Sequence, residues 1–352
     1  MTDNPLQPSN TVKINFMFSP HKDMLGHTLA NADSEHKAEH SILSAGTEVT
    51  FLDTGIIKFE PNTAATQSLV ISCAIHGNET APIEIVNQII NDLLAEEQKC
   101  GQRVLFIFGN PWAMNAAERF VDINMNRLFC GHWQTQDLSL KEVKRAAKLE
   151  AYVANFFAEE PVTVTERLHY DCHTAIRDST RTRFAVYPFV AERKLPNSEK
   201  DFLAHAQINT LLLQQKPANT FSSFSSIKQN AQSFTLELGK VQPFGSNNLA
   251  DFNGIDKALR KRIAGETLPS SVQGAVEGFE VCHEIERTSV DWQFFIDDSA
   301  TNFSAYPEGF MVWQDGDKSY QVENAEEYIV FPNPNVPIGQ RAGLMLKKDN
   351  NL

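Results

Sequence analysis

The sequence SCAIHGNETAP, residues 72–82, joins two segments of different character. Before it, the continuous apolar run 68–75 is typical of a buried strand. After it, the apolar residues of segment 83–97 recur with helical spacing. His76 and Glu79 are therefore predicted to lie at the end of a strand, on the turn that opens a helix.

A His and a Glu three residues apart on one tight turn can point toward a single centre. Gly77 suits a sharp bend, and Thr80 and Pro82 suit a helix cap and its first turn. With a third histidine from elsewhere, the pair would form a His₂Glu set with a fourth position for water, as in many catalytic zinc sites. A lone H-x-x-E triplet also occurs by chance, so the rest of the chain must decide.

The composition limits the classes of partner. The chain has 352 residues, 21% of them charged and 42% hydrophobic, which suggests one large domain and a smaller one. A formal net charge of -13 argues against nucleic acid and anionic membranes as partners and leaves a small-molecule substrate. Whether the protein forms a homo-oligomer stays open.

The cysteine pattern and the N-terminus indicate the compartment. The five cysteines form no C-x-x-C pair, which disfavours a disulfide framework and a cysteine zinc site. The polar N-terminus lacks a signal-peptide pattern, and no apolar run approaches the ~20 residues that span a bilayer. We therefore predict a cytoplasmic protein.

Apolar strands and helices alternate through the first three quarters of the chain. Strands are predicted at 103–108, 167–173, 183–189 and 233–238, helices at 138–157, 198–215 and 249–264, a hairpin at 48–59, and a serine-rich loop at 217–231. This alternation implies an α/β domain, 1–267, with a mixed, mainly parallel sheet flanked by helices. From residue 268 onward short strands dominate, which predicts a small C-terminal β domain, 268–352.

In parallel sheets, sites form beyond the carboxyl ends of the strands. The loop after strand 103–108 carries Arg119, Asn126 and Arg127, and guanidinium groups match carboxylates well. Pairing of these arginines with surface acids is the alternative. The position of the loop favours a role in binding.

The segment 167–173 places three polar side chains on one face of a strand, namely His169, Asp171 and His173. The last of them is best placed at the sheet edge, so His173 is predicted to be the third metal ligand. Asp171 could orient a ligand histidine, or it could be a loop carboxylate. His169 is interpreted as structural, and Arg177 further along could bind substrate or belong to a solvated cluster.

Glu237 lies near the end of the apolar strand 233–238. A buried carboxylate is costly unless it is partnered or its pKa rises, and a raised pKa suits a general base. Glu237 is thus the best candidate for a base in the chain. An ion pair with Lys240 or an arginine is the structural alternative.

Five short blocks occur in the order His76-Gly-Asn-Glu79-Thr-Ala-Pro, Asn110-Pro111, Arg119 with Asn126-Arg127-Leu-Phe, Asp171-Cys-His173-Thr-Ala, and Leu236-Glu237-Leu-Gly. Together they resemble the succinylglutamate desuccinylase/aspartoacylase family, a branch of the zinc-carboxypeptidase-like fold. The blocks span residues 76–239, and the small β domain after them fits the same architecture. Each block alone is weak, but five in order are specific.

The resemblance implies a zinc hydrolase of linear amides with one Zn²⁺ per subunit and a role for each matching residue. The zinc ligands are matched by His76, Glu79 and His173. Glu237 matches the general base. Arg119 matches the arginine that polarises the scissile carbonyl. Asn126 and Arg127 match the pair that binds a substrate carboxylate.

Two positions depart from the aspartoacylase pattern. Asn124 stands where aspartoacylases commonly carry Asp, and it is left out of the predicted site. About ten residues before the base, where aspartoacylases carry an arginine, this sequence has Ile227 and Lys228. Lys228 and Arg177 are kept as further substrate-binding candidates.

Several other segments favour one branch of the family, namely 173–177 (HTAIR), 237–241 (ELGKV), 243–245 (PFG) and 341–344 (RAGL). This branch hydrolyses N-succinyl-L-glutamate to succinate and L-glutamate, the last step of the arginine succinyltransferase degradation pathway. The alternatives are a zinc deacylase of another N-acyl amino acid, as in aspartoacylase, or a carboxypeptidase. A catalytically silent family member that only binds a ligand is the non-enzyme alternative.

Overall fold

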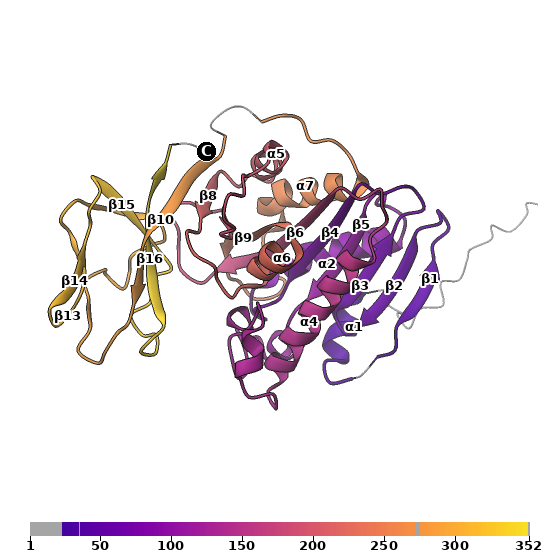
Figure 1. The fold of residues 1–352 in the computed structure, drawn as a ribbon. Helices are drawn as coiled ribbons and strands as arrows, with labels where there is room; N and C mark the ends of the chain where they lie inside the picture. Colours follow the sequence, from indigo (N-terminus) through magenta and orange to yellow (C-terminus); the bar gives the residue numbers. More distant parts are fainter. Residues whose placement is uncertain (1–22, 35, 272–274, 351–352) are drawn as a thin grey trace, which may run out of the picture.

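The computed structural model describes residues 23–34, 36–271 and 275–350 (Figure 1). Among them, thirteen strands join in one sheet, in the order β1-β2-β3-β5-β4-β6-β9-β7-β8-β10-β16-β15-β12. The strands of its first part are β1 (Glu39–Ile42), β2 (Glu48–Asp53), β3 (Ile56–Glu60), β4 (Gln67–Cys73), β5 (Arg103–Phe108), β6 (Glu166–Ala175), β7 (Phe184–Tyr187), β8 (Thr210–Leu213) and β9 (Gln232–Lys240). The central pairs β5–β4, β4–β6 and β6–β9 are parallel.

Helices cover both faces of this sheet. They are α1 (Met24–Ala30), α2 (Thr80–Leu94), α3 (Pro111–Ala116), α4 (Lys141–Ala158), α5 (Asn197–His205), α6 (Phe221–Gln229) and α7 (Asn253–Ala264). The apolar residues of α2, α5 and α7 share one buried cluster with strand residues of one face. Those of α4 and α6 form a second cluster with residues such as Val70 and Leu105. The predicted α/β class, with a mainly parallel core, is confirmed.

Two predicted elements are wrong. The helix predicted over 198–215 ends at His205, and the apolar residues that follow form the buried strand β8. The loop predicted over 217–231 contains the helix α6. Its serines are poor helix formers in isolation, but they bond to neighbouring strands, as Ser222 does to Thr235 and Ser226 to Ser233.

The last quarter of the chain is rich in strands: β10 (Glu277–Glu286), β11 (Gln293–Phe294), β12 (Ser304–Pro307), β13 (Met311–Asp315), β14 (Lys318–Gln321), β15 (Glu326–Val330) and β16 (Arg341–Asp349). The strands β11, β13 and β14 form a separate sheet. The start of β10 pairs with β8 in parallel, from Glu277 with Thr210 to Glu280 with Leu213. The large sheet therefore includes strands from both sides of residue 268. The division of the chain into two domains at that point stays a prediction.

No helix of the described residues is both long and apolar enough to cross a bilayer.

A histidine in this C-terminal part should make stability depend on pH. The ring of His283 stacks on Tyr320, with 3.6 Å between centroids, and its Nε2 accepts a hydrogen bond from Trp313 Nε1 at 3.0 Å. Since an indole N–H can only donate, protonation of Nε2 breaks this bond. Burial lowers the pKa of His283 from its ordinary value of 6.5, and the positive charge of Lys216 lowers it further. The negative charges of Glu327, Glu323 and Glu284 oppose this shift.

The stabilisation by neutral His283 is complete above pH 6.5 and is lost as the pH falls through the lowered pKa. Between pH 8 and pH 5 the free energy of unfolding should fall by about 1 kcal/mol more in the protein than in a His283→Phe variant. Urea unfolding at both pH values measures the difference. An equal fall in the free energy of unfolding in both proteins would show that protonation of His283 does not destabilise the fold.

Candidate active site

The turn between β4 and α2 holds the first two predicted ligands. Ala74 takes the left-handed backbone conformation there, with φ 57°. Gly77 does not, and it is needed for another reason. A Cβ at this position would lie 2.1 Å from the carbonyl carbon of Ala113. The glycine thus lets the turn pack on α3, and its N–H donates to Arg119 O at 3.2 Å.

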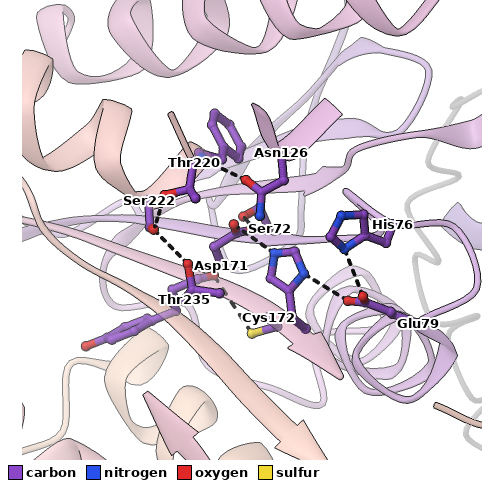
Figure 2. A network of polar contacts seen from close by, with 12 residues as sticks. Ser72, His76, Glu79, Asn126, Asp171, Cys172, Thr220, Ser222 and Thr235 are labelled. Atoms are coloured by element: carbon purple, nitrogen blue, oxygen red, sulfur yellow. Dashed lines mark hydrogen bonds and ion pairs between the residues drawn. The ribbon is translucent and has the colours of Figure 1, made fainter. Parts of the chain in front are cut away.

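Three buried side chains converge at this turn. Oxygen Oε1 of Glu79 lies 2.8 Å from His76 Nδ1, and Oε2 lies 2.8 Å from His173 Nδ1. Figure 2 shows His76 and Glu79 side by side, next to the network around Asp171. One ligand atom from each residue lies within 4.8 Å of the others, so the set could hold a metal ion. The structure brings together the three predicted ligands.

Hydrogen bonds behind His76 fix its tautomer. Asn124 Oδ1 accepts from the backbone N–H of Asn126 at 3.0 Å, which identifies this atom as the amide oxygen. The same oxygen lies 3.0 Å from His76 Nε2. Since an amide oxygen only accepts, Nε2 must carry the proton. His76 Nδ1 then presents a lone pair to the centre.

A carboxylate does the same for His173. Asp171 Oδ2 lies 3.0 Å from His173 Nε2, and Asp171 Oδ1 accepts from Ser72 Oγ at 2.6 Å. Since Ser72 spends its proton on Asp171, His169 Nε2 must donate to Ser72 Oγ, 2.8 Å away. His169 Nδ1 then accepts from Ser225 Oγ at 2.7 Å. Asp171 thus orients His173, the third predicted ligand, and His169 is linked to Asp171 through Ser72.

The donor set suits a cation, because two imidazole nitrogens and a carboxylate face one point. Burial lowers the pKa of His76 to about 4, so this ring is neutral near pH 7. Burial also acts to lower the pKa of His173, but Asp171 and Glu79 raise it well above its ordinary range. Burial would raise the pKa of Glu79, yet the two histidines hold it well below. A bound metal would replace the proton on His173, and the residues fit zinc.

Glu237 lies on the strand next to His173. The two residues are direct partners in the β6–β9 register, and Glu237 is only 9% exposed. The described residues offer its Oε2 no hydrogen-bond partner. Burial, helped by the charges of Glu79 and Asp171 and opposed by those of His173 and Arg119, raises its pKa to about 7. Lys240 pairs instead with Asp178, at 2.7 Å. Neither Lys240 nor an arginine of the described residues forms an ion pair with Glu237.

Arg119 reaches the centre from the loop after α3. Its Nη1 donates to Glu79 Oε1 at 2.7 Å, and its side chain is 31% exposed. The buried Glu142 holds the loop, since its Oε1 accepts from the N–H groups of Val121 at 2.7 Å and Asp122 at 3.3 Å. Arg119 therefore presents its guanidinium at the solvent side of the centre.

Asn126 and Arg127 lie on the next turn of the same loop. Asn126 is buried, and its Oδ1 accepts from the N–H of Phe221 at the start of α6, at 3.0 Å. Figure 2 shows how this contact continues through Thr220 and the Ser222–Thr235 pair to β9. Arg127 is exposed and donates to Asn126 O at 2.8 Å. The structure thus ties the predicted carboxylate-binding pair to α6 and β9.

The two remaining candidates have other surroundings. Arg177 Nη1 donates to the backbone carbonyls of Asp298 and of Ala300, the latter at 3.0 Å, and so links β6 to the C-terminal part. Lys228 is exposed in the last turn of α6, while the first residue of this helix contacts Asn126. A substrate-binding role for either residue stays a prediction.

Comparisons with known proteins agree with this geometry. Residues 65–263 match the model of the succinylglutamate desuccinylase/aspartoacylase catalytic domain, and residues 274–349 match the AstE/AspA barrel-sandwich hybrid domain. The chain belongs to the succinylglutamate desuccinylase/aspartoacylase family. Its assignment to this family, and to an enzyme, is therefore confirmed.

Relatives within the family cover nearly the whole chain. The succinylglutamate desuccinylase of Shewanella frigidimarina is 44% identical over 92% of this chain and 95% of its own length. The succinylglutamate desuccinylase of Shewanella woodyi is 41% identical over 93% of this chain and 95% of its own length. Among solved structures, the succinylglutamate desuccinylase of Chromobacterium violaceum is 35% identical with a TM-score of 0.82, over 94% of this chain and 98% of that one. The succinylglutamate desuccinylase of Vibrio parahaemolyticus is 35% identical with a TM-score of 0.84, over 93% of this chain and 95% of that one.

Asn124 is the site residue that sequence reasoning missed. Its position two residues before Asn126, in a loop that leaves a strand end, was the available signal. The family pattern gives it no role, because Asn124 departs from the Asp of aspartoacylases. In the structure it backs His76 as Asp171 backs His173, but without a charge.

Changing Asn124 should change the metal affinity of this family member. Leucine removes the acceptor that fixes His76, and we expect a zinc affinity 10- to 100-fold lower. Aspartate adds a charge that makes His76 a better electron donor, so the affinity should rise. Competition with a chromogenic chelator measures both changes. Asn115→Ala is the control, since Asn115 bonds to Leu29 O instead. Equal affinities in all variants would contradict the role of Asn124.

Proposed function

We propose that the protein is a zinc-dependent amide hydrolase that converts N-succinyl-L-glutamate and water to succinate and L-glutamate. The observation that carries the proposal is the buried carboxylate of Glu237, whose Oε2 has no hydrogen-bond partner among the described residues, beside the converging His76, Glu79 and His173. The names of the relatives support the choice of substrate. On this proposal the chain acts in the cytoplasm, as the last step of arginine degradation by the succinyltransferase route.

The proposed mechanism divides the work among the residues of the site. When bound by His76, Glu79 and His173, zinc supplies Lewis acidity that makes water nucleophilic near neutral pH. Glu237, with a pKa of about 7, takes a proton from the attacking water and later delivers it to the leaving amine nitrogen. Arg119, at the solvent side, donates to the oxygen of the scissile carbonyl as negative charge develops on it.

The substrate carries three carboxylates, so the acidic protein must concentrate positive charge at the site. Arg127 is an exposed residue on the loop that also carries Arg119 and the buried Asn126. A guanidinium can bind a carboxylate through two parallel hydrogen bonds. Arg127 therefore binds one substrate carboxylate, and Asn126 positions the loop.

The test is to incubate the zinc-loaded protein with N-succinyl-L-glutamate and, separately, N-acetyl-L-aspartate, and to assay the released amino acid. Release from the succinyl substrate, absent in a Glu237→Ala variant, is the expected result. Release from the acetyl substrate alone would reassign the protein as an aspartoacylase-like deacylase. Release from neither by protein that contains zinc would reject the proposed reaction.

A further inference from the structure

Arg341, the first residue of β16, has a weakly paired guanidinium. Its Nη1 lies 3.7 Å from Glu284 Oε1, and Glu284 is shared with Lys216 at 3.6 Å. Within the described residues the structure gives Arg341 no shorter polar contact. Arg103, by contrast, donates to Glu60 at 2.7 and 2.9 Å and to Ser68 at 2.8 Å. The forked donors of Arg341 are thus free to bind a further group.

Arg341 also lines a cavity of about 130 Å³, together with Lys216, Ala218 and His283. The cavity adjoins the loop that carries Arg127. Ala218 O accepts from Cys130 Sγ at 3.5 Å, and Cys130 follows Arg127 by three residues. The C-terminal part of the chain therefore presents an arginine beside the substrate-binding loop.

The charges around Arg127 agree with this placement. Arg127 is an exposed residue, but the protein around its guanidinium replaces part of the surrounding water. This desolvation, and then the positive charges of Arg341 and Arg119, lower the pKa of Arg127 to about 10. The charges of two guanidinium groups thus act on Arg127. One belongs to Arg119, which contacts Glu79 of the predicted metal site, and the other belongs to Arg341 of β16. Like charges that act on one another in this way cost free energy unless anions bind among them.

We infer that Arg341 binds a carboxylate of the substrate, so that the C-terminal part of the chain takes part in substrate selection. The ligand class is a polycarboxylate with at least one carboxylate beyond the one that Arg127 binds. The inference rests on the proposed function, whose substrate has three carboxylates. Arg341 is accordingly a specificity-determining residue, distant in sequence from the metal ligands and the base.

The experiment measures binding without turnover. Glu237→Gln serves as the parent, and calorimetry gives the Kd of N-succinyl-L-glutamate for the zinc-loaded protein. Adding Arg341→Gln should raise Kd tenfold or more, as expected for loss of a hydrogen bond between charged groups. Adding Arg287→Gln is the matched control and should leave Kd within twofold. Arg287 lies in the same part of the chain and donates to Val336 O at 3.0 Å.

A second variant covers the case in which Arg341→Gln does not fold. Glu284→Gln removes the competing acid and should lower Kd at least twofold. The inference is overturned if Arg341→Gln changes Kd less than threefold, if Arg287→Gln has an equal effect, or if Glu284→Gln fails to tighten binding. Hydrolysis by the unmodified protein is assayed separately, so failure of the proposed reaction is distinguished from failure of this binding role.

Discussion

Replacing Glu237 by glutamine should lower kcat about 1,000-fold while zinc affinity stays within twofold. The loss follows from the removal of a general base, which contributes roughly 10²–10⁴-fold in comparable enzymes. Glutamine keeps the shape of the side chain but cannot take a proton. Steady-state release of glutamate from N-succinyl-L-glutamate measures the change, and metal analysis checks the zinc content.

Lys240→Gln provides the control for this prediction. Lys240 is three residues further along β9 but pairs with Asp178, so its removal should leave kcat within twofold. If Glu237→Gln retained a tenth of the activity, another group would have to be the base. If both variants lost activity equally, the effect would come from the end of β9 and not from the carboxylate.

The same substitution should stabilise the metal-free protein at pH 8. The fold raises the pKa of Glu237 from 4.5 to about 7, so the folded state binds its proton more tightly than the unfolded state does. The stability that this proton contributes is complete below pH 4.5 and is lost as the pH rises through 7. At pH 8 the protein therefore carries a buried negative charge on Glu237, whose Oε2 has no partner in the described part of the chain. Glutamine removes the cost of burying that charge.

Removing His173 should destabilise the metal-free protein more than removing His76, although both changes should abolish zinc binding. His173 lies between the buried carboxylates of Asp171 and Glu79, which hold it protonated. Without it, the two acids face each other with no cation between them. Breaking a buried ion pair in this way costs about 3–5 kcal/mol.

His76 is neutral and is backed by the uncharged Asn124. Its loss leaves Glu79 paired with His173 and Arg119, so His76→Ala should cost only about 1 kcal/mol, for the lost hydrogen bond to Asn124. Urea unfolding in the presence of a chelator measures both variants at pH 7. The exposed His132 offers a control, and His132→Ala should have little effect. Equal destabilisation by the two ligand variants would contradict this charge assignment.

The sequence predicts where His76, Glu79 and His173 lie because its local signals and its tertiary contacts agree. The strand 68–75 and the helix after it appear as β4 and α2, with His76 and Glu79 on the turn between them. His173 and Glu237 were found because each lies near the end of an apolar strand, and parallel strands bring such ends to one edge. Their direct pairing in the register required the structure.

The errors have physical causes of two kinds. An apolar run such as Thr210–Leu213 fits a buried strand or a buried helix equally well by periodicity, so β8 was absorbed into the predicted helix 198–215. The serine-rich α6 is stabilised by contacts with β6 and β9 that no local pattern reveals. No local pattern points to Arg341, because only the folded chain places its charge where it acts on Arg127.

The pairing of β10 with β8 limits how the protein can admit its substrate. Four residue pairs, from Glu277 with Thr210 to Glu280 with Leu213, connect the C-terminal part to the catalytic sheet. A hinge that swung this part away as a rigid lid would have to break those backbone hydrogen bonds, each costly to leave unmade. We therefore expect substrate entry and product release to depend on movements of loops such as the one that carries Arg119 and Arg127. The C-terminal part and the catalytic sheet should stay fixed to each other throughout turnover.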